Sequence, residues 1–138
     1  MLDYLLDTDI CIHALKGRSA ALAALFKTND GRMAISDVTL FELCYGAEKY
    51  ADPAARLAVI ENFAARLELL PFDSRAAHHA GNIRAALERE GRTIGAYDLM
   101  IAGTARSQGL VLATNNLREF ERVEGLRVER WGEAKLRD

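Results

Sequence analysis

The sequence predicts an α/β fold in which a short, mostly parallel sheet of four to five strands is flanked by helices in three layers. Short apolar runs alternate with longer amphipathic stretches, which is the pattern of strands joined by helical crossovers. Strands this short and apolar, separated by helices, are typical of a parallel sheet covered on both faces. The 138 residues include two prolines and no repeat or low-complexity linker, so we expect one domain, residues 1–138.

The first half of the chain is expected to hold three strands and four helices. Apolar runs predict the strands, and amphipathic spacing predicts the helices. Ser36 or Asp37 is expected to cap the helix after the second strand, and Asp52-Pro53 combines an N-cap with a proline at the first helical position. The expected strands are Tyr4–Leu6, Met33–Ile35 and Leu67–Leu70, and the expected helices are Ile10–Lys16, Ala20–Lys27, Val38–Lys49 and Pro53–Arg66.

The second half is expected to hold two helices and two strands. A long helix capped by Ser74 should stop at Gly91, and a second helix should end at Gly109, since glycine is the usual residue just past a helix end. Ligands of such sheets bind outside the carboxyl ends of the strands. The expected elements are the helices Ser74–Glu90 and Asp98–Gln108, the strand Leu110–Ala113 and a fifth, edge strand at Arg127–Glu129.

Composition describes an ordinary folded protein and gives little direct indication of a partner. No apolar run approaches the ~20 residues of a membrane-spanning helix, and the N-terminus lacks the basic and apolar regions of a signal peptide. Cys11 and Cys44 lie in apolar runs and are expected to be buried thiols of a cytoplasmic protein. The net charge of −2 does not indicate a nucleic-acid binder. Fourteen arginines against four lysines suit phosphate binding but equally fit GC-rich coding.

Acidic residues fall at the carboxyl edge of the predicted sheet. Asp7 directly follows the first strand, Glu42 lies one turn into the helix after the second strand, and Asp98 begins the helix that leads into the fourth strand. The fourth strand itself closes with Thr114-Asn115-Asn116. Because the carboxyl ends of parallel strands meet at one edge, these residues are expected to converge on one crevice.

Helix capping is the simpler explanation for two of these acids. Asp7 and Asp98 both stand where an aspartate would cap the first backbone N–H groups of a helix. However, Glu42 and Asp98 lie in apolar stretches, where an unpaired carboxylate is costly. A shared cation would offset that cost. Carboxylates without clustered histidines or cysteines indicate Mg²⁺, or Mn²⁺, rather than zinc.

Four segments are spread in order over nearly the whole length of the chain: Leu5–Ile10, Ile35–Gly46, Gly95–Ala102 and Ala113–Phe120. With these segments at this spacing, the chain resembles the PIN-domain ribonucleases, specifically the VapC toxins of bacterial type II toxin–antitoxin pairs. Each segment alone is a weak signal, whereas four at matching spacing are specific. The resemblance implies a three-layer, Rossmann-like PIN fold.

The resemblance also implies roles for particular residues. Asp7 and Asp98 correspond to the magnesium ligands, and Glu42 completes the acidic cluster directly or through water. The family's fourth acid is replaced here by Asn116, which offers a carbonyl oxygen but no charge. Glu119 is expected to supply that charge, as in the branch of the family with the same Thr-Asn-Asn-x-Arg-Glu-Phe ending. Whether a second metal binds is left open.

The implied activity is Mg²⁺-dependent hydrolysis of RNA phosphodiesters, leaving 5′-phosphate and 3′-hydroxyl ends. The implied substrate is single-stranded or loop RNA, with the anticodon stem-loop of transfer RNA as the expected target. The implied partners are a cognate VapB-like antitoxin and a second copy of the chain in a homodimer. Thr8 and Asp9 are expected to orient Asp7 or a water near the metal. Arg118 is a candidate for holding an RNA phosphate, with an exposed salt bridge as its alternative.

Two other functions fit parts of the sequence. Asp7-Thr8-Asp9 mimics the Asp-x-Asp of haloacid-dehalogenase-like phosphatases, but Cys11 stands where that motif has threonine or valine, and no lysine lies near the fourth strand. The second alternative is a non-catalytic RNA- or protein-binding module whose acids are only caps. The chain has no nucleotide-binding glycine motif and no Gly-x-Ser-x-Gly elbow.

Overall fold

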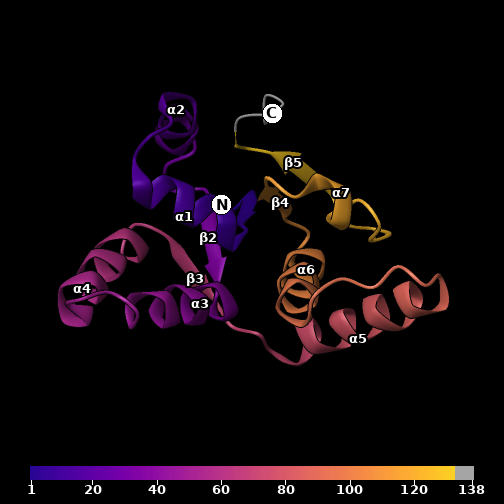
Figure 1. Cartoon of the computed structure of the whole chain (residues 1–138). Coiled ribbons are helices and arrows are strands. Elements are labelled where there is room, and N and C mark those ends of the chain that lie inside the picture. The colour runs from indigo at the N-terminus through magenta and orange to yellow at the C-terminus, as the bar shows by residue number, and fades with distance from the viewer. Residues whose placement is uncertain (133–138) are drawn as a thin grey trace.

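The computed structural model describes residues 1–132, so the last six residues of the expected domain, 133–138, lie outside the described residues. Five strands form one sheet in the order β3-β2-β1-β4-β5, and every neighbouring pair is parallel (Figure 1). The predicted α/β fold and all five predicted strands are confirmed. The strands are β1 Tyr4–Leu6, β2 Met33–Ser36, β3 Glu68–Leu70, β4 Val111–Thr114 and β5 Val128–Arg130.

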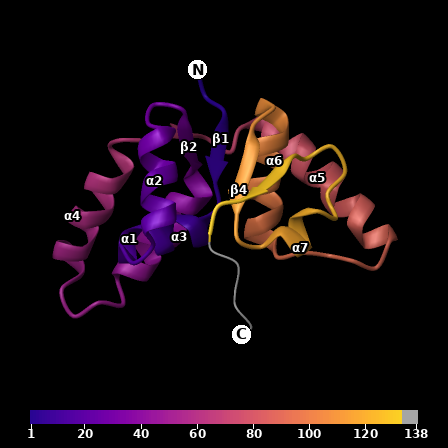
Figure 2. The ribbon, with the colours of Figure 1, turned by 90° about the horizontal axis from the view of Figure 1, so that it is seen from above.

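Helices cover both faces of the sheet. Figure 2 shows α1 to α4 grouped on one side of the strands and α5, α6 and α7 on the other. No helix among residues 1–132 is both long and apolar enough to cross a membrane. The helices are α1 Thr8–Lys16, α2 Ala20–Thr28, α3 Asp37–Ala47, α4 Pro53–Ala64, α5 Ser74–Arg89, α6 Ala96–Gln108 and α7 Leu117–Phe120.

Two apolar cores hold the layers together, and the pleat of the strands divides residues between them. In β1, Leu5 packs into the core under α5 and α6, whereas Leu6 packs into the core with α1 and α3; both are fully buried. In β2, Ala34 and Ile35 divide in the same way. A strand buried on both faces is apolar at every position, which is why these runs do not alternate with polar residues.

Several helix starts differ from the sequence-based expectation. α1 begins at Thr8 rather than Ile10, because Asp7 caps it. The cap of α5 is Asp73, not Ser74: its carboxylate accepts a hydrogen bond from the Ala76 N–H at 2.9 Å. α6 begins at Ala96, so Asp98 lies inside its first turn instead of starting the helix. The short helix α7 was not predicted at all.

The position of α6 is fixed by close packing against α5. A Cβ atom on Gly103 would lie 2.7 Å from the Ala76 carbonyl oxygen and 2.8 Å from the Ala80 Cβ. Only glycine lets the two helix backbones approach this closely. Since Asp98 lies on α6 one to two turns before Gly103, this contact also sets where its carboxylate stands at the sheet edge.

Candidate active site

Asp7 lies at the carboxyl end of β1, where it is 5% exposed. Its Oδ1 accepts a hydrogen bond from the Thr8 N–H at 2.8 Å, and its Oδ2 accepts one from the Thr114 hydroxyl at 2.7 Å. Thr114 ends β4, the strand beside β1, so the carboxylate is held between the ends of two neighbouring strands. Asp7 therefore does cap α1, as the capping explanation expected. A cap uses only one carboxylate oxygen, so capping does not account for the bond between Oδ2 and Thr114.

Glu42 is half-buried on α3 and is held from α1. The Thr8 hydroxyl donates to Glu42 Oε1 at 2.6 Å and lies 3.0 Å from the Thr39 hydroxyl. Thr8 thus touches two acids, with its backbone N–H on Asp7 and its hydroxyl on Glu42. The expectation that Thr8 orients Asp7 holds for its N–H alone, while its side chain positions the second acid.

Asp98 is half-buried in the first turn of α6 and caps nothing: the N-cap position is Gly95, which has no side chain to bond. The pKa of Asp98 is raised to about 6, first by burial and then by the negative charges of Asp7, Glu119 and Glu42. These four acids are the ones expected from the sequence. The structure brings their carboxylates close enough for each of the other three charges to act on Asp98.

Asp9 is a fifth acid of the cluster and was expected only to orient Asp7 or a water near the metal. Its Oδ2 accepts from the Asn115 N–H at 3.2 Å, whereas its buried Oδ1 has no hydrogen-bond partner within the described part of the chain. The pKa of Asp7 is raised to about 7, first by burial and then by the charge of Asp9. Burial also raises the pKa of Asp9 itself. The Asp-x-Asp spacing was the signal for this second aspartate.

Asn116 and Glu119 form one unit at the end of β4. The Asn116 side-chain amide donates to Glu119 Oε1 at 3.1 Å, and the Asn116 N–H donates to the Thr114 hydroxyl at 2.9 Å. Asn116 therefore positions the Glu119 carboxylate, while Thr114 connects this unit to Asp7. Arg118 is exposed on α7, and no ion pair within residues 1–132 includes it, so the salt-bridge alternative for Arg118 gains no support.

The donor set fits a hard divalent cation. Every carboxylate in the cluster offers oxygen ligands, and Asp9 Oδ1 has no hydrogen-bond partner within the described residues. The pKa values of Asp7 and Asp98 are raised first by burial and then by neighbouring negative charge, and a bound cation would offset both effects. Within residues 1–132, no three His, Cys, Asp or Glu side chains are already arranged around one metal position. Mg²⁺ suits such a site because it keeps several waters and takes one or two carboxylates from the protein.

The raised pKa values predict how stability depends on pH. A carboxyl group with a raised pKa binds its proton more tightly in the folded state, so its contribution to stability is fully present below about pH 4, the unfolded pKa. It is lost as the pH rises through the folded values, about 6 for Asp98 and about 7 for Asp7. In chelator, Asp98→Asn should therefore melt at or above wild type, by a margin that grows between pH 5 and pH 8.

Mg²⁺ should reverse this loss in wild type. At ten times its dissociation constant it should stabilise the fold by about 1.4 kcal/mol, a shift of a few degrees in Tm, and it should do little for Asp98→Asn. The control is Asp73→Asn, which changes a capping aspartate outside the cluster and should leave the Mg²⁺ response intact. Equal Mg²⁺ responses in wild type and Asp98→Asn would contradict a metal-binding role for Asp98.

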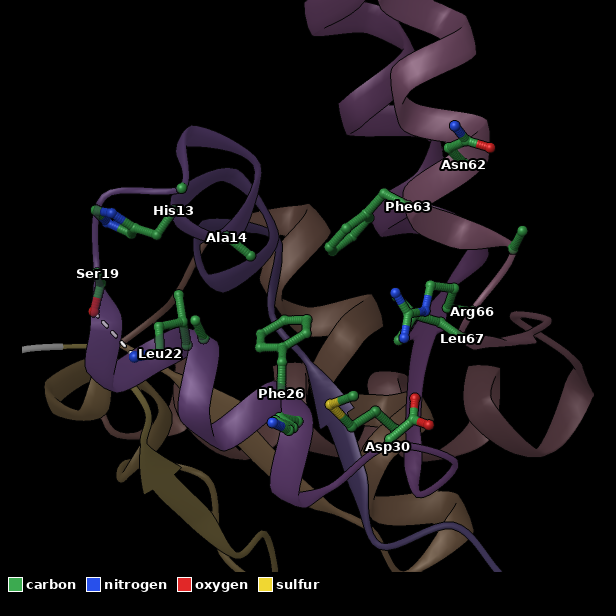
Figure 3. Close-up of a pocket in the computed structure, with 15 residues that line it drawn as sticks. His13, Ala14, Ser19, Leu22, Phe26, Asp30, Asn62, Phe63, Arg66 and Leu67 are labelled. Atoms are coloured by element: carbon green, nitrogen blue, oxygen red, sulfur yellow. Dashed lines mark hydrogen bonds between the residues drawn. The ribbon is translucent and has the colours of Figure 1, made fainter.

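A separate cavity of about 890 Å³ lies between α1, α2 and the end of α4 (Figure 3). Its apolar lining includes Leu22, Phe26 and Phe63, and the centroids of the two phenyl rings lie 6.0 Å apart. His13 and Arg66 stand on opposite sides of it in Figure 3. The five acids do not line this cavity, so it is a second surface feature rather than part of the acidic cluster.

Comparison with known proteins assigns this chain to one family. The PIN domain family matches residues 4–126, and the chain belongs to the PIN-domain family. PIN-domain nucleases generally depend on divalent metal ions. This assignment leaves the haloacid-dehalogenase-like alternative without support.

The curated relatives include a protein of Shigella flexneri named tRNA(fMet)-specific endonuclease VapC, 55% identical over 131 residues, which cover 95% of this chain and 99% of that protein. A protein named ribonuclease VapC2 from Haemophilus influenzae is 49% identical over 131 residues, with the same shares covered. Among solved structures, DNA-bound VapBC from Salmonella typhimurium matches with a TM-score of 0.92 and 52% identity over 96% of this chain and 100% of that chain.

Proposed function

We propose that this chain is a metal-dependent endoribonuclease of the VapC type, the toxin of a toxin–antitoxin pair. The observation that carries the proposal is the convergence of five carboxylates at the carboxyl edge of a PIN-family sheet whose relatives are named as ribonucleases. Because two relatives of more than 50% identity are named tRNA(fMet)-specific endonucleases, the proposed substrate is transfer RNA, cut in the anticodon stem-loop.

Asp7 and Asp98 are the proposed ligands of one Mg²⁺ ion, with Mn²⁺ as a substitute. When bound, the ion supplies Lewis acidity toward the phosphodiester and its attacking water. Glu42 is positioned by Thr8 through Oε1, so its Oε2 is the proposed acceptor of the proton that leaves the attacking water. Glu119 is positioned by Asn116 and adds its negative charge to the cluster from α7, close enough to act on Asp98.

The products test this function directly. Purified protein incubated with a tRNA(fMet) anticodon stem-loop in Mg²⁺ should give a discrete cut with 5′-phosphate and 3′-hydroxyl ends, and chelator should stop it. Release of phosphate from p-nitrophenyl phosphate without RNA cleavage would indicate a phosphatase. Binding of the RNA without any cleavage would indicate a non-catalytic module.

The proposed protein partner is a cognate VapB-like antitoxin, since the matched solved structures include VapBC complexes. The acidic cluster suits an arginine or lysine from the antitoxin tail. The cavity of Figure 3 suits an apolar anchor on the same tail. Asp7, at the acids, caps α1, and His13, at the cavity, lies in its last turn. Six helical residues rise about 9 Å, so about three extended residues would connect the two sites.

The structure of the antitoxin complex tests this mode of inhibition. We expect a basic side chain among Asp7, Glu42 and Asp98, and an apolar side chain against Phe26 and Phe63. Inhibition with the three carboxylates left open to solvent and to Mg²⁺ would contradict it.

We also propose that this chain acts in the cytoplasm as a homodimer whose two acidic sites share one groove. The cytoplasmic location is supported by two free cysteines, buried Cys11 and half-buried Cys44.

A further inference from the structure

The exposed aromatic side chains of this chain are gathered in one region. Of its ten aromatic residues, all of which lie in the described range, four are classed as exposed, each 45–57% exposed. They come from α3, from the turn that follows it and from the first turn of α6. These four are Phe41, Tyr45, Tyr50 and Tyr97, and we call them the aromatic stripe.

The inner end of the aromatic stripe adjoins the acids. Phe41 directly precedes Glu42 on α3, and Tyr97 directly precedes Asp98 on α6. The two rings contact each other edge to face, with centroids 5.4 Å apart, and so connect the same two helices that carry these acids. Tyr45 lies one helical turn beyond Phe41 on the same face of α3, so the stripe continues along this helix.

The outer end of the aromatic stripe carries cations. The Lys49 Nζ lies 4.3 Å from the centroid of the Tyr45 ring, and the Arg56 guanidinium carbon lies 4.6 Å from that of Tyr50. Exposed rings interspersed with cations are typical of surfaces that bind single-stranded nucleic acid, where bases stack and phosphates are neutralised. The centre of a subunit interface is depleted of charged residues. This combination therefore favours RNA over a second copy of the chain.

We propose that the aromatic stripe stacks unpaired bases of the RNA substrate and thereby places the phosphodiester at the acidic cluster. The proposal rests on the proposed ribonuclease function and adds to it the surface that selects single-stranded over paired RNA. Stacking tolerates any base because every base has a π-face, so the stripe contributes affinity and position rather than sequence specificity. Lys49 and Arg56 neutralise the phosphates between the stacked bases.

Cleavage kinetics of a loop-containing RNA test this proposal. Phe41→Ala and Tyr45→Ala should each raise the half-saturating protein concentration roughly 5- to 150-fold in single-turnover cleavage, and change the maximal rate far less. Phe41→Tyr and Tyr45→Phe keep the ring and should restore wild-type values. The control is Leu69→Ala, which shortens an equally exposed apolar side chain on the edge strand β3.

A binding measurement separates stacking from catalysis. A 2-aminopurine base in the RNA loop should lose fluorescence on binding Asp7→Asn protein and keep it with Asp7→Asn/Phe41→Ala. If wild type cleaves RNA and both alanine variants have its half-saturating concentration, the proposed role of the aromatic stripe is wrong and the ribonuclease function stands. If wild type does not cleave RNA, the proposed function itself is wrong. Sedimentation showing that the alanine variants turn a dimer into a monomer would identify the stripe as a subunit interface and overturn the proposal.

Discussion

Asp7→Asn is expected to lower the single-turnover rate of RNA cleavage at least about a thousandfold, which corresponds to about 4 kcal/mol of transition-state stabilisation. Asparagine keeps an oxygen to accept the Thr8 N–H and remains an N-cap as good as aspartate. The Thr114 hydroxyl can rotate to accept from the new amide instead of donating to a carboxylate. The substitution therefore removes charge from the cluster and leaves the local fold intact, which circular dichroism and Tm should show.

A capping aspartate outside the cluster provides the matched control for Asp7. Asp73 caps α5 by accepting a hydrogen bond from the Ala76 N–H, as Asp7 caps α1. Asp73 is exposed, however, and its charge is not among those that raise the pKa of Asp7 or Asp98. Asp73→Asn should cleave RNA within about twofold of wild type, since Asp and Asn are equivalent N-caps. If Asp7→Asn kept more than a tenth of the wild-type rate, capping would be a sufficient explanation for Asp7.

Glu119→Gln is expected to reduce the cleavage rate by roughly a thousandfold, and Asn116→Ala by much less. The charge of Glu119 acts on Asp98, whereas Asn116 contributes one hydrogen bond that positions Glu119. Glutamine keeps the size of the side chain and removes only its charge. The comparison thus measures whether Glu119 replaces the fourth acid of the family.

Both variants should bind the stem-loop RNA with wild-type affinity, because neither residue belongs to the aromatic stripe. Equal and small losses of rate from Glu119→Gln and Asn116→Ala would show that Asp7, Glu42 and Asp98 suffice. A larger loss from Asn116→Ala than from Glu119→Gln would instead make the asparagine carbonyl the functional group.

The sheet and the position of its acids were predictable because both follow from local pattern. Strands such as Tyr4–Leu6 and Met33–Ser36 are short apolar runs, and parallel order brings their carboxyl ends to one edge. The meeting of Asp7, Glu42 and Asp98 follows from that order alone. The edge strand Val128–Arg130 was predicted one residue early, which is the usual error for an element with few apolar residues.

The hydrogen bonds within the cluster were not predictable, because they join residues far apart in the chain. Thr8 reaches Glu42 across 34 positions and Thr114 reaches Asp7 across 107. The short helix α7 was missed because four residues are too few to show a helical period. Asp98 was expected to start its helix, yet Gly95 occupies the N-cap without a side-chain bond, and no local rule chooses glycine there over a nearby aspartate.

The Mg²⁺ dependence of RNA cleavage tests the central claim, that these carboxylates form one metal-dependent catalytic cluster. Wild type, Asp98→Asn and Asp73→Asn should each be assayed on the same stem-loop RNA, first in chelator and then over a series of Mg²⁺ concentrations. We predict no cleavage by any of them in chelator, saturable activation of wild type and Asp73→Asn by Mg²⁺, and no recovery of Asp98→Asn at any concentration. Cleavage by wild type that persists in chelator, or activation of Asp98→Asn to the wild-type rate, would contradict the claim.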